Sequence, residues 1–267
     1  MPARHPERIV CLTEETTETL YLLGEERRIV GISGYTVRPP RARQEKPRVS
    51  AFLSAKNEKI LALKPDLVLG FSDLQADILR DLAKAGLNVM VFNQRSVDEI
   101  LSMILTLSSI VGVADKGAAL VRELESGLAS VRRAAGRFEK KPRVYFEEWD
   151  EPMISGIRWV SELVEIAGGE DVFKHLSFSQ SAPGRIVADG GEVVKRSPDV
   201  IIGSWCGKKF RPERVAARPG WDEIPAVRNG ELHEIKSADI LQPGPAALTD
   251  GVRRIGEILG AWASQRR

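Results

Sequence analysis

Short apolar runs alternate with helical patterns along this chain, and one arrangement occurs twice. Residues 60–70 read ILALKPDLVLG, and residues 193–203 read VVKRSPDVIIG. In both, a helix end is followed by Pro-Asp, a short apolar run and Gly. A proline ends a helix, and a continuous apolar run is typical of a strand that is buried on both faces. We interpret the glycine as the residue that turns the chain after each strand.

Further apolar runs extend this repeat in both directions. Residues 8–12 and 143–147 open the two halves as strands, and helical patterns that end in Gly follow at 17–24 and 160–168. Later strands are predicted at 88–92 and 231–235. Because strands that alternate with helices form parallel sheets, we predict an α/β fold of two similar lobes. Each lobe is expected to be a mostly parallel sheet flanked by helices, with a ligand cleft between the lobes.

A long helical pattern separates the two halves. Its apolar residues keep helical spacing on both sides of Gly112, which we expect to break or kink the helix. We predict an N-terminal lobe at 1–95, a connecting helical segment at 96–140 and a C-terminal lobe at 141–267. A rigid helical connection of this kind should limit reorientation of the lobes more than extended strands would.

Composition and charge exclude several classes of protein. Lys plus Arg is 39 and Asp plus Glu is 37, so the formal charge is only +2, and a nucleic-acid partner is not expected. We find no metal-ligand motif, no apolar run long enough to cross a membrane and no apolar signal segment before the first strand. These features predict a monomeric cytoplasmic protein, or a periplasmic one if a signal segment has been removed.

Five segments together carry a resemblance to a known family. The chain resembles the ABC-importer solute-binding proteins with a single connecting helix, which bind vitamin B12, haem or ferric siderophores. The matching segments are RIVCLTEETTETLYLLG, RIVGISGYTVRPP, NEKILALKPDLVLG, GLNVMVFNQRSVDEI and ISGIRWVSELVEIAGGEDVF. The resemblance covers nearly the whole chain and implies a non-catalytic binding protein.

The resemblance also implies roles for individual residues. Tyr35 and Phe52 align with aromatic ligand contacts of the B12-binding branch, and Phe71 aligns with a Trp there, which favours a corrinoid such as cobalamin or cobinamide as the ligand. The family docks on an ABC permease dimer through one surface Glu per lobe. Glu58 aligns with the first of these, whereas Gly191 stands at the second position and Glu192 follows it.

Aromatic residues follow several of the predicted strands. In α/β folds, ligands bind beyond the carboxyl ends of strands, so a set of rings at these ends is expected to face the ligand. The set comprises Tyr35, Phe71, Trp149 and Trp205. Trp159 precedes a helix and is assigned equally to the cleft wall or to the core, whereas Trp221 and Trp262 are expected to pack inside.

Two charged segments after strands leave alternatives open. In the loop 203–212, Trp205 is expected to stack on the ligand while Lys208 or Arg211 meets a phosphate or carboxylate, and the alternative is a solvated loop. The acidic group 147–151 is assigned to the amide edge of a ligand or to a solvated turn. An enzyme that uses Glu147, Glu148 and Cys206 is the rival from another class.

Other ligands of the same fold class remain alternatives. Haem requires an axial ligand, for which Tyr35 or His175 is a candidate. A ferric siderophore requires an Arg-rich cleft, which this sequence has only in part. No catalytic cofactor and no protein-bound metal are expected, and Cys11, inside the run 9–12, is interpreted as a buried thiol.

Overall fold

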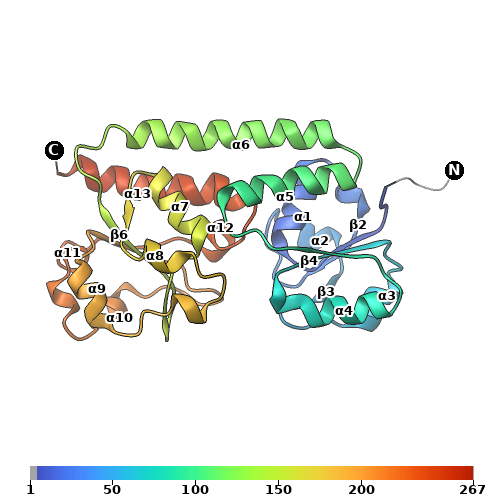
Figure 1. Ribbon diagram of the computed structural model, residues 1–267, viewed down its shortest axis with the longest axis horizontal. Helices are drawn as coiled ribbons and strands as arrows, with labels where there is room; N and C mark the ends of the chain where they lie inside the picture. Colours follow the sequence, from blue (N-terminus) through green and yellow to red (C-terminus); the bar gives the residue numbers. More distant parts are fainter. Residues whose placement is uncertain (1–4, 267) are drawn as a thin grey trace. The chain divides into compact units, whose positions relative to one another are not determined.

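The computed structural model describes residues 5–266, in which the chain forms two compact α/β units. Unit 1 comprises the residues up to Gln94 together with Asp98–Glu123, and unit 2 comprises Arg95–Val97 and the residues from Leu124 onward. The predicted α/β fold of two sheet-containing lobes is confirmed (Figure 1). Residues 1–4, within the stretch considered for a signal segment, and Arg267 lie outside the described residues.

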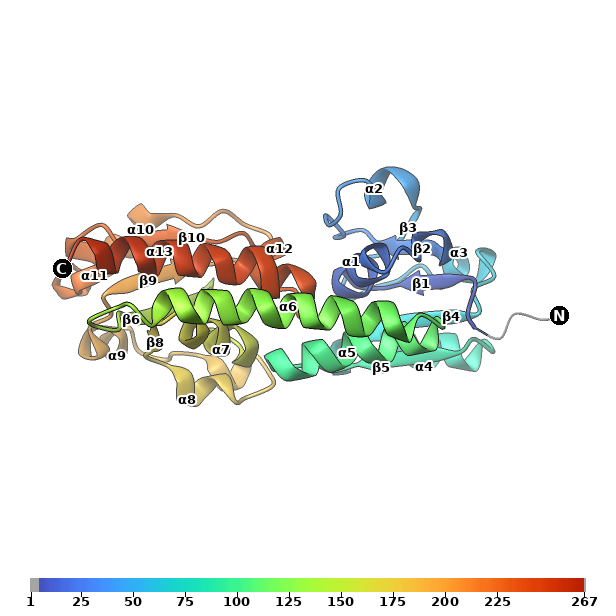
Figure 2. The same ribbon diagram turned by 90° about the horizontal axis from the view of Figure 1, so that it is seen from above.

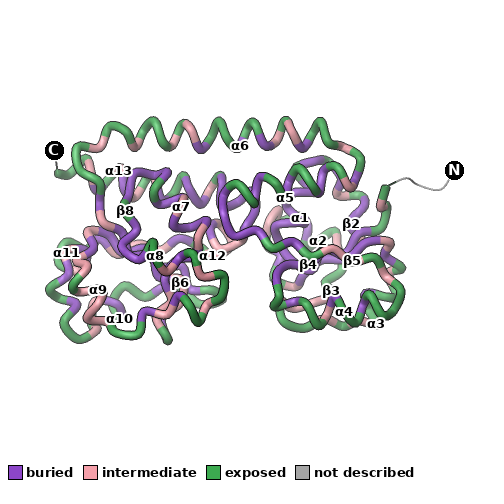
Figure 3. The backbone as a smooth tube through the Cα atoms, viewed as in Figure 1, coloured by how far each residue is buried: buried purple, intermediate pink, exposed green. Residues whose placement is uncertain are grey.

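Unit 1 is built on one parallel sheet of five strands in the order β3-β2-β1-β4-β5 (Figure 2). Its strands are β1 Ile9–Cys11, β2 Ile29–Ser33, β3 Arg48–Ser50, β4 Leu67–Phe71 and β5 Val89–Phe92. The short helices between them are α1 Glu14–Leu22, η1 Glu26–Arg28, α2 Ala42–Glu45, α3 Asn57–Ala62, η2 Asp73–Gln75 and α4 Ala76–Lys84. The three central strands have almost no exposed residue, as expected for strands covered on both faces (Figure 3).

Side chains of the unit 1 strands alternate between two helical layers. Val10 and Val68 pack with Ile60 of α3 and with Leu79 and Leu82 of α4. The opposite face is covered by α1 and by α5 (Val97–Ile110), as Figure 1 shows. α6 (Ala114–Ala135) follows α5 after a break at Gly112, whose φ of 78° is favourable for glycine, so the predicted break is confirmed.

Unit 2 is built on a mixed sheet in the order β10-β9-β6-β7, with β8 also pairing β6. Only the β6–β7 pair is antiparallel among these strands of the described chain. The strands are β6 Arg143–Asp150, β7 Met153–Ser155, β8 Glu170–Asp171, β9 Val200–Gly203 and β10 Leu232–Glu234. The helices are α7 Arg158–Ile166, α8 Lys174–Ser177, η3 Pro183–Arg185, α9 Gly190–Arg196, α10 Pro212–Ala216, η4 Trp221–Glu223, α11 Pro225–Arg228, α12 Ser237–Ile240, η5 Ala247–Gly251 and α13 Val252–Ser264.

The two glycines of the sequence repeat serve a different purpose from the predicted one. Gly70 lies inside β4 and Gly203 is the last residue of β9, so neither forms a turn. A Cβ at Gly70 would lie 2.6 Å from Leu79 Cδ1, and one at Gly203 would lie 1.9 Å from the Phe210 ring. Glycine is therefore required because a large side chain packs directly against each strand.

A buried ion pair lies on the face of the unit 2 sheet that α9, α10 and α11 cover. The Glu147 carboxylate is fully buried on β6 and accepts two hydrogen bonds from the Arg218 guanidinium, at 2.6 and 3.0 Å. It also accepts from Trp205 Nε1 and from the Tyr145 hydroxyl, each at 3.0 Å. The Arg218 guanidinium lies 4.5 Å from the centroid of the Trp221 ring. Because all four contacts satisfy the carboxylate, the charge is tolerated inside an apolar cluster.

The charges of this pair also affect neighbouring ionisations. Burial, followed by the negative charge of Glu147, raises the pKa of the Tyr145 phenol well above its ordinary value. Burial opposes the charge on Arg218, but the hydrogen bonds to Glu147 outweigh it and raise the pKa of the guanidinium. Tyr145 therefore remains a neutral donor to a charged pair at all physiological pH values.

Glu14, Glu15 and Glu18 are buried in the first turns of α1, directly after β1. Glu15 Oε1 accepts a hydrogen bond of 2.6 Å from the Thr13 hydroxyl. Burial raises the pKa of Glu15 from 4.5 to about 8, and burial also raises the pKa of Glu14. The folded chain therefore keeps the Glu15 proton near neutral pH.

Glu15→Gln should flatten the pH dependence of stability. The unfolded chain releases this proton near pH 4.5 and the folded chain only near pH 8, so the stabilisation is complete below pH 4.5 and is lost as the pH rises through about 8. Within that window the wild type should lose up to about 1.4 kcal/mol per pH unit through this group. Urea unfolding between pH 5 and pH 9 measures the slope. The exposed Glu125→Gln variant is the control, and equal slopes for Glu15→Gln and wild type would contradict the assignment.

Arg218→Met should destabilise unit 2 strongly, because it leaves the Glu147 charge buried without a partner. Breaking such a pair from one side costs about 3–5 kcal/mol. Adding Glu147→Gln removes that charge, so the double variant should be more stable than Arg218→Met alone. Urea unfolding measures whether the stabilities of the variants follow this order. Arg214→Met, which removes an exposed guanidinium, is the matched control. Similar losses for Arg218→Met and Arg214→Met would show that the pair does not support the fold.

Candidate functional site

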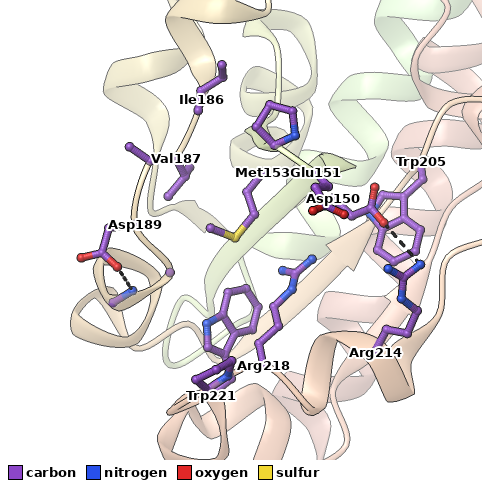
Figure 4. A pocket seen from close by; sticks show the side chains of 15 residues that line it. Asp150, Glu151, Met153, Ile186, Val187, Asp189, Trp205, Arg214, Arg218 and Trp221 are labelled. Atoms are coloured by element: carbon purple, nitrogen blue, oxygen red, sulfur yellow. Dashed lines mark hydrogen bonds and ion pairs between the residues drawn. The ribbon is translucent and has the colours of Figure 1, made fainter.

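A hollow of about 590 Å³ opens in unit 2 beside the end of β6 (Figure 4). Four segments form its wall: the β6–β7 turn, the chain that leads into α9, the residue Trp205 after β9, and the stretch from α10 to η4. The lining residues are Asp150, Glu151, Pro152, Met153, Ile186, Val187, Ala188, Asp189, Gly190, Gly191, Trp205, Arg214, Arg218, Pro219 and Trp221. Since Asp150 and Trp205 follow β6 and β9, the hollow lies at the carboxyl edge of this sheet, where α/β proteins bind ligands.

A buried carboxylate at this edge is paired with exposed cations. Asp150, the last residue of β6, is buried and forms an ion pair with the ammonium group of Lys208. The Arg214 guanidinium lies 3.8 Å from the same carboxylate, and its side chain is exposed (Figure 4). The exposed Arg214 guanidinium is weakly held at this distance, so it can reach an anionic group of a ligand.

Lys208 also covers an aromatic ring. Its Nζ lies 4.0 Å from the centroid of Trp149 and 5.5 Å from that of Trp205. Trp149 is half-buried, and its Nε1 donates a hydrogen bond of 2.8 Å to the Glu151 carbonyl. The loop that begins after β9 therefore brings the predicted residues Trp149, Trp205 and Lys208 together.

The acidic group 147–151 is held by arginines and a lysine of unit 2. Besides Glu147 and Asp150, Glu148 accepts hydrogen bonds of 2.5 and 3.1 Å from Arg185, which is buried and also donates to the Ser155 carbonyl at 2.6 Å. Glu147, Glu148 and Asp150 are therefore not free carboxylates, whereas Glu151 is exposed in the turn that follows. Sequence reasoning missed Arg185 and Arg218 because they lie 37 and 71 residues from their partners.

Unit 1 presents an apolar rim at the carboxyl edge of its own sheet. Tyr35 after β2, Leu53 after β3 and Leu74 after β4 are 59%, 67% and 55% exposed, and Phe52 is half-buried. Exposed apolar side chains gathered at one edge are a common mark of a binding surface. We call Tyr35, Phe52, Leu53 and Leu74 the unit 1 rim.

A strained residue shapes this rim. Ser72 has φ 57° and ψ 178°, a conformation that residues other than glycine adopt at a cost of about 1–3 kcal/mol. Its amide donates to the Phe92 carbonyl at 2.8 Å, and its hydroxyl accepts from the Leu74 amide at 3.2 Å. The strained turn directs Leu74 outward immediately after β4.

Two rings expected to face the ligand are buried, and so is Trp159, which the sequence assigns equally to the cleft wall or to the core. Trp205 is only 3% exposed although it lines the hollow, because Phe210 packs against its ring at 5.0 Å between centroids and its Nε1 donates to Glu147. Trp159 is buried in α7 and donates to the Ile240 carbonyl at 2.9 Å. Phe71 is the last residue of β4 and is buried. The three rings have the expected places along the chain, but they pack in the interior and are not exposed to a ligand.

The remaining candidates lie apart from the hollow. Glu58 is exposed in the first turn of α3, and Glu192 is half-buried in the first turn of α9, where it pairs with Lys195 at 2.7 Å. Cys206 is exposed, and neither it nor the buried Cys11 forms a disulfide. Cys11 is buried, as predicted, and burial raises the pKa of its thiol to about 12.

His175 lines a second hollow of unit 2, of about 430 Å³. Arg143, the first residue of β6, lines the same hollow, so this second hollow lies at the amino end of that strand.

Trp221 and Trp262 are buried as predicted, although Trp221 also lines the first hollow. Within residues 5–266, no helix is both long and apolar enough to cross a membrane.

Two relatives with similar sequences cover most of the chain. An uncharacterized ABC transporter substrate-binding lipoprotein of Bacillus subtilis (strain 168) is 26% identical over 263 residues, which are 95% of this chain and 80% of the relative. The vitamin B12-binding protein of Vibrio parahaemolyticus is 28% identical over 246 residues, which are 91% of this chain and 86% of the relative.

Solved structures share the fold at lower identity. A possible iron-binding periplasmic solute-binding protein from Staphylococcus epidermidis matches with a TM-score of 0.83 at 22% identity, over 96% of this chain and 99% of that one. The periplasmic haem-binding protein from Roseiflexus sp. RS-1 matches with a TM-score of 0.80 at 24% identity, over 95% of this chain and 99% of that one. A family model for periplasmic binding proteins matches residues 9–238, and the chain therefore belongs to the periplasmic binding protein family.

Proposed function

We propose that this protein binds a corrinoid, such as cobalamin or cobinamide, as a non-catalytic solute-binding protein. The observation that carries the proposal is the exposed apolar unit 1 rim at the carboxyl edge of a parallel sheet. Burying such side chains against a ligand is worth about 1.5–3 kcal/mol for each one fully covered. The named B12-binding relative, similar over 91% of this chain, supports a corrinoid as that ligand.

The chemistry of a corrinoid suits the side chains that each unit offers. The macrocycle is flat and largely apolar on its faces, which suits Tyr35 and Phe52, while its perimeter carries amides. Cobalamin also carries a phosphodiester, and in unit 2 the exposed Arg214 and the ammonium of Lys208 are cations that suit an anion. Trp149, half-buried beneath Lys208, adds an aromatic face if the lysine moves aside.

Haem is the second candidate, and one residue favours it. Tyr35 is exposed on the rim, and a phenolate is an established axial ligand of haem iron. The haem-binding Roseiflexus protein has the same fold. His175, the other candidate ligand, is less suitable because it lines the hollow at the amino end of β6.

We also propose that the protein delivers its ligand to an ABC permease outside the cytoplasm. The Bacillus relative is named as a lipoprotein, which favours the periplasmic alternative over the cytoplasmic location expected from the sequence. Glu58 and Glu192 lie in the first turns of surface helices, where a permease arginine can reach them. The ion pair of Glu192 with Lys195 is exposed and therefore easily exchanged.

An enzymatic function using the acidic group is less well supported. Glu147 is fully occupied by Arg218, Trp205 and Tyr145, and Glu148 is held by Arg185. Glu147 is not placed to take a proton from a substrate in this conformation, because its four acceptor positions are already used, and each oxygen of Glu148 is bound to the buried Arg185.

Isothermal titration with cyanocobalamin, dicyanocobinamide and haemin tests the ligand. We expect micromolar or tighter binding of a corrinoid. Tyr35→Ala and Trp149→Ala should each weaken binding by roughly tenfold or more, since each removes a ring that the ligand would cover. Phe178→Ala, which removes an exposed ring that lines the second hollow of unit 2 and not the first, is the matched control for corrinoid binding. Saturable binding of haemin with no heat from either corrinoid would replace the corrinoid by haem.

A further inference from the structure

Gln75, the last residue of η2, is fully buried beneath the unit 1 rim. Its Oε1 accepts a hydrogen bond of 3.0 Å from the Phe71 amide. Its Nε2 donates to the Phe52 carbonyl at 2.9 Å and to the Leu12 carbonyl at 3.3 Å. One side chain therefore satisfies backbone groups from three separate segments.

These three segments all leave the carboxyl edge of the sheet, where β1 and β4 are neighbours and β2 lies between β1 and β3. Leu12 follows β1, Phe52 follows β3, and Phe71 ends β4. Phe52 lies 23 residues before Gln75 and Leu12 lies 63 residues before it. A neutral amide suits this position because it offers both a donor group and an acceptor, and all three backbone partners are buried or half-buried.

The segment that carries Phe52 is a short folded tip. The Ala51 amide donates to the Ser54 carbonyl at 2.7 Å, and the Lys56 amide donates to the Val49 carbonyl at 3.2 Å. These bonds close residues 49–56 on themselves and leave Leu53 exposed at the end. Gln75 attaches the tip to the sheet through the Phe52 carbonyl, so it sets where the Phe52 and Leu53 side chains lie.

We propose that Gln75 is a positioning residue that holds the Phe52–Leu53 tip in its ligand-binding arrangement. The proposal rests on the proposed ligand-binding function and names how the unit 1 rim is prepared for it. A rim that is already ordered loses less conformational freedom when a ligand binds, which raises affinity without a direct contact. The bond to Leu12 ties this arrangement to β1, at the centre of the sheet.

Gln75→Glu tests this at pH 7.5, because it keeps an acceptor for Phe71 but removes both N–H donors. A buried carboxyl that keeps its proton retains one O–H donor, so Gln75→Met, which has no donor, is measured beside it. Without ligand, amides of residues 51–56 should exchange with deuterium faster than in the wild type. Corrinoid affinity should fall by about three- to tenfold, the range for one lost hydrogen bond, chiefly through faster dissociation. The exposed Gln44→Glu variant is the matched control and should change neither measurement.

A double-mutant cycle with Phe52→Ala separates positioning from a general structural role. If Gln75 acts through the tip, Gln75→Glu should weaken corrinoid binding in the wild-type background but not when Phe52 is already Ala. An equal loss in both backgrounds, or unchanged exchange of residues 51–56, would overturn the proposal. Should Gln75→Glu fold poorly, Gln75→Met, which fills the same volume without hydrogen bonds, takes its place in both measurements.

The titrations distinguish a failure of the proposed ligand-binding function from a failure of the proposal about Gln75. If the wild type binds no corrinoid but binds haemin, the same cycle is carried out with haemin. If it binds neither, the proposed function is wrong, and deuterium exchange in the ligand-free protein alone decides whether Gln75 holds the tip.

Discussion

The burial of the Glu147 charge is the constraint on which the hollow in unit 2 depends. A carboxylate inside an apolar cluster is stable only when a cation and further donors surround it. Arg218 supplies the charge, and Trp205 and Tyr145 supply the remaining donors. Because Arg218, Trp205 and Trp221 also line the hollow, neutralising this one charge fixes residues from two of the four segments of its wall.

The repeated Pro-Asp and apolar pattern was sufficient to predict two mostly parallel sheets and most of their strands. It missed β3, β7 and β8, which have three, three and two residues and too few positions to show a periodic pattern. It also gave the wrong reason for Gly70 and Gly203. A sequence shows that a side chain is absent, but only the fold shows that Leu79 and Phe210 occupy the space.

The position of the site along the chain could be predicted better than the exposure of its residues. Trp149 and Trp205 both come at or just after the end of a strand, yet one is half-buried and the other is in the core. The difference arises because the register of β6 shifts between Glu147 and Trp149, whereas Trp205 turns inward to donate to Glu147. The partners that decide this, such as Arg218, are distant in sequence, so no local pattern contains them.

Different side chains lie beneath the carboxyl edges of the two sheets, and the surface that each edge exposes explains the difference. Beneath the apolar unit 1 rim the support is Gln75, a neutral amide whose hydrogen bonds do not change if a ligand excludes water from the rim. A buried ion pair there would lose solvation each time the rim was covered, at a cost that its attraction would not fully offset. In unit 2 the surface already carries Lys208 and Arg214, and an anionic ligand group would replace the water that they lose. The neutral Gln75 therefore supports the apolar tip of unit 1, although an ion pair of Arg38 with Glu18 also lies at this edge, whereas ion pairs lie beside the charged surface of unit 2.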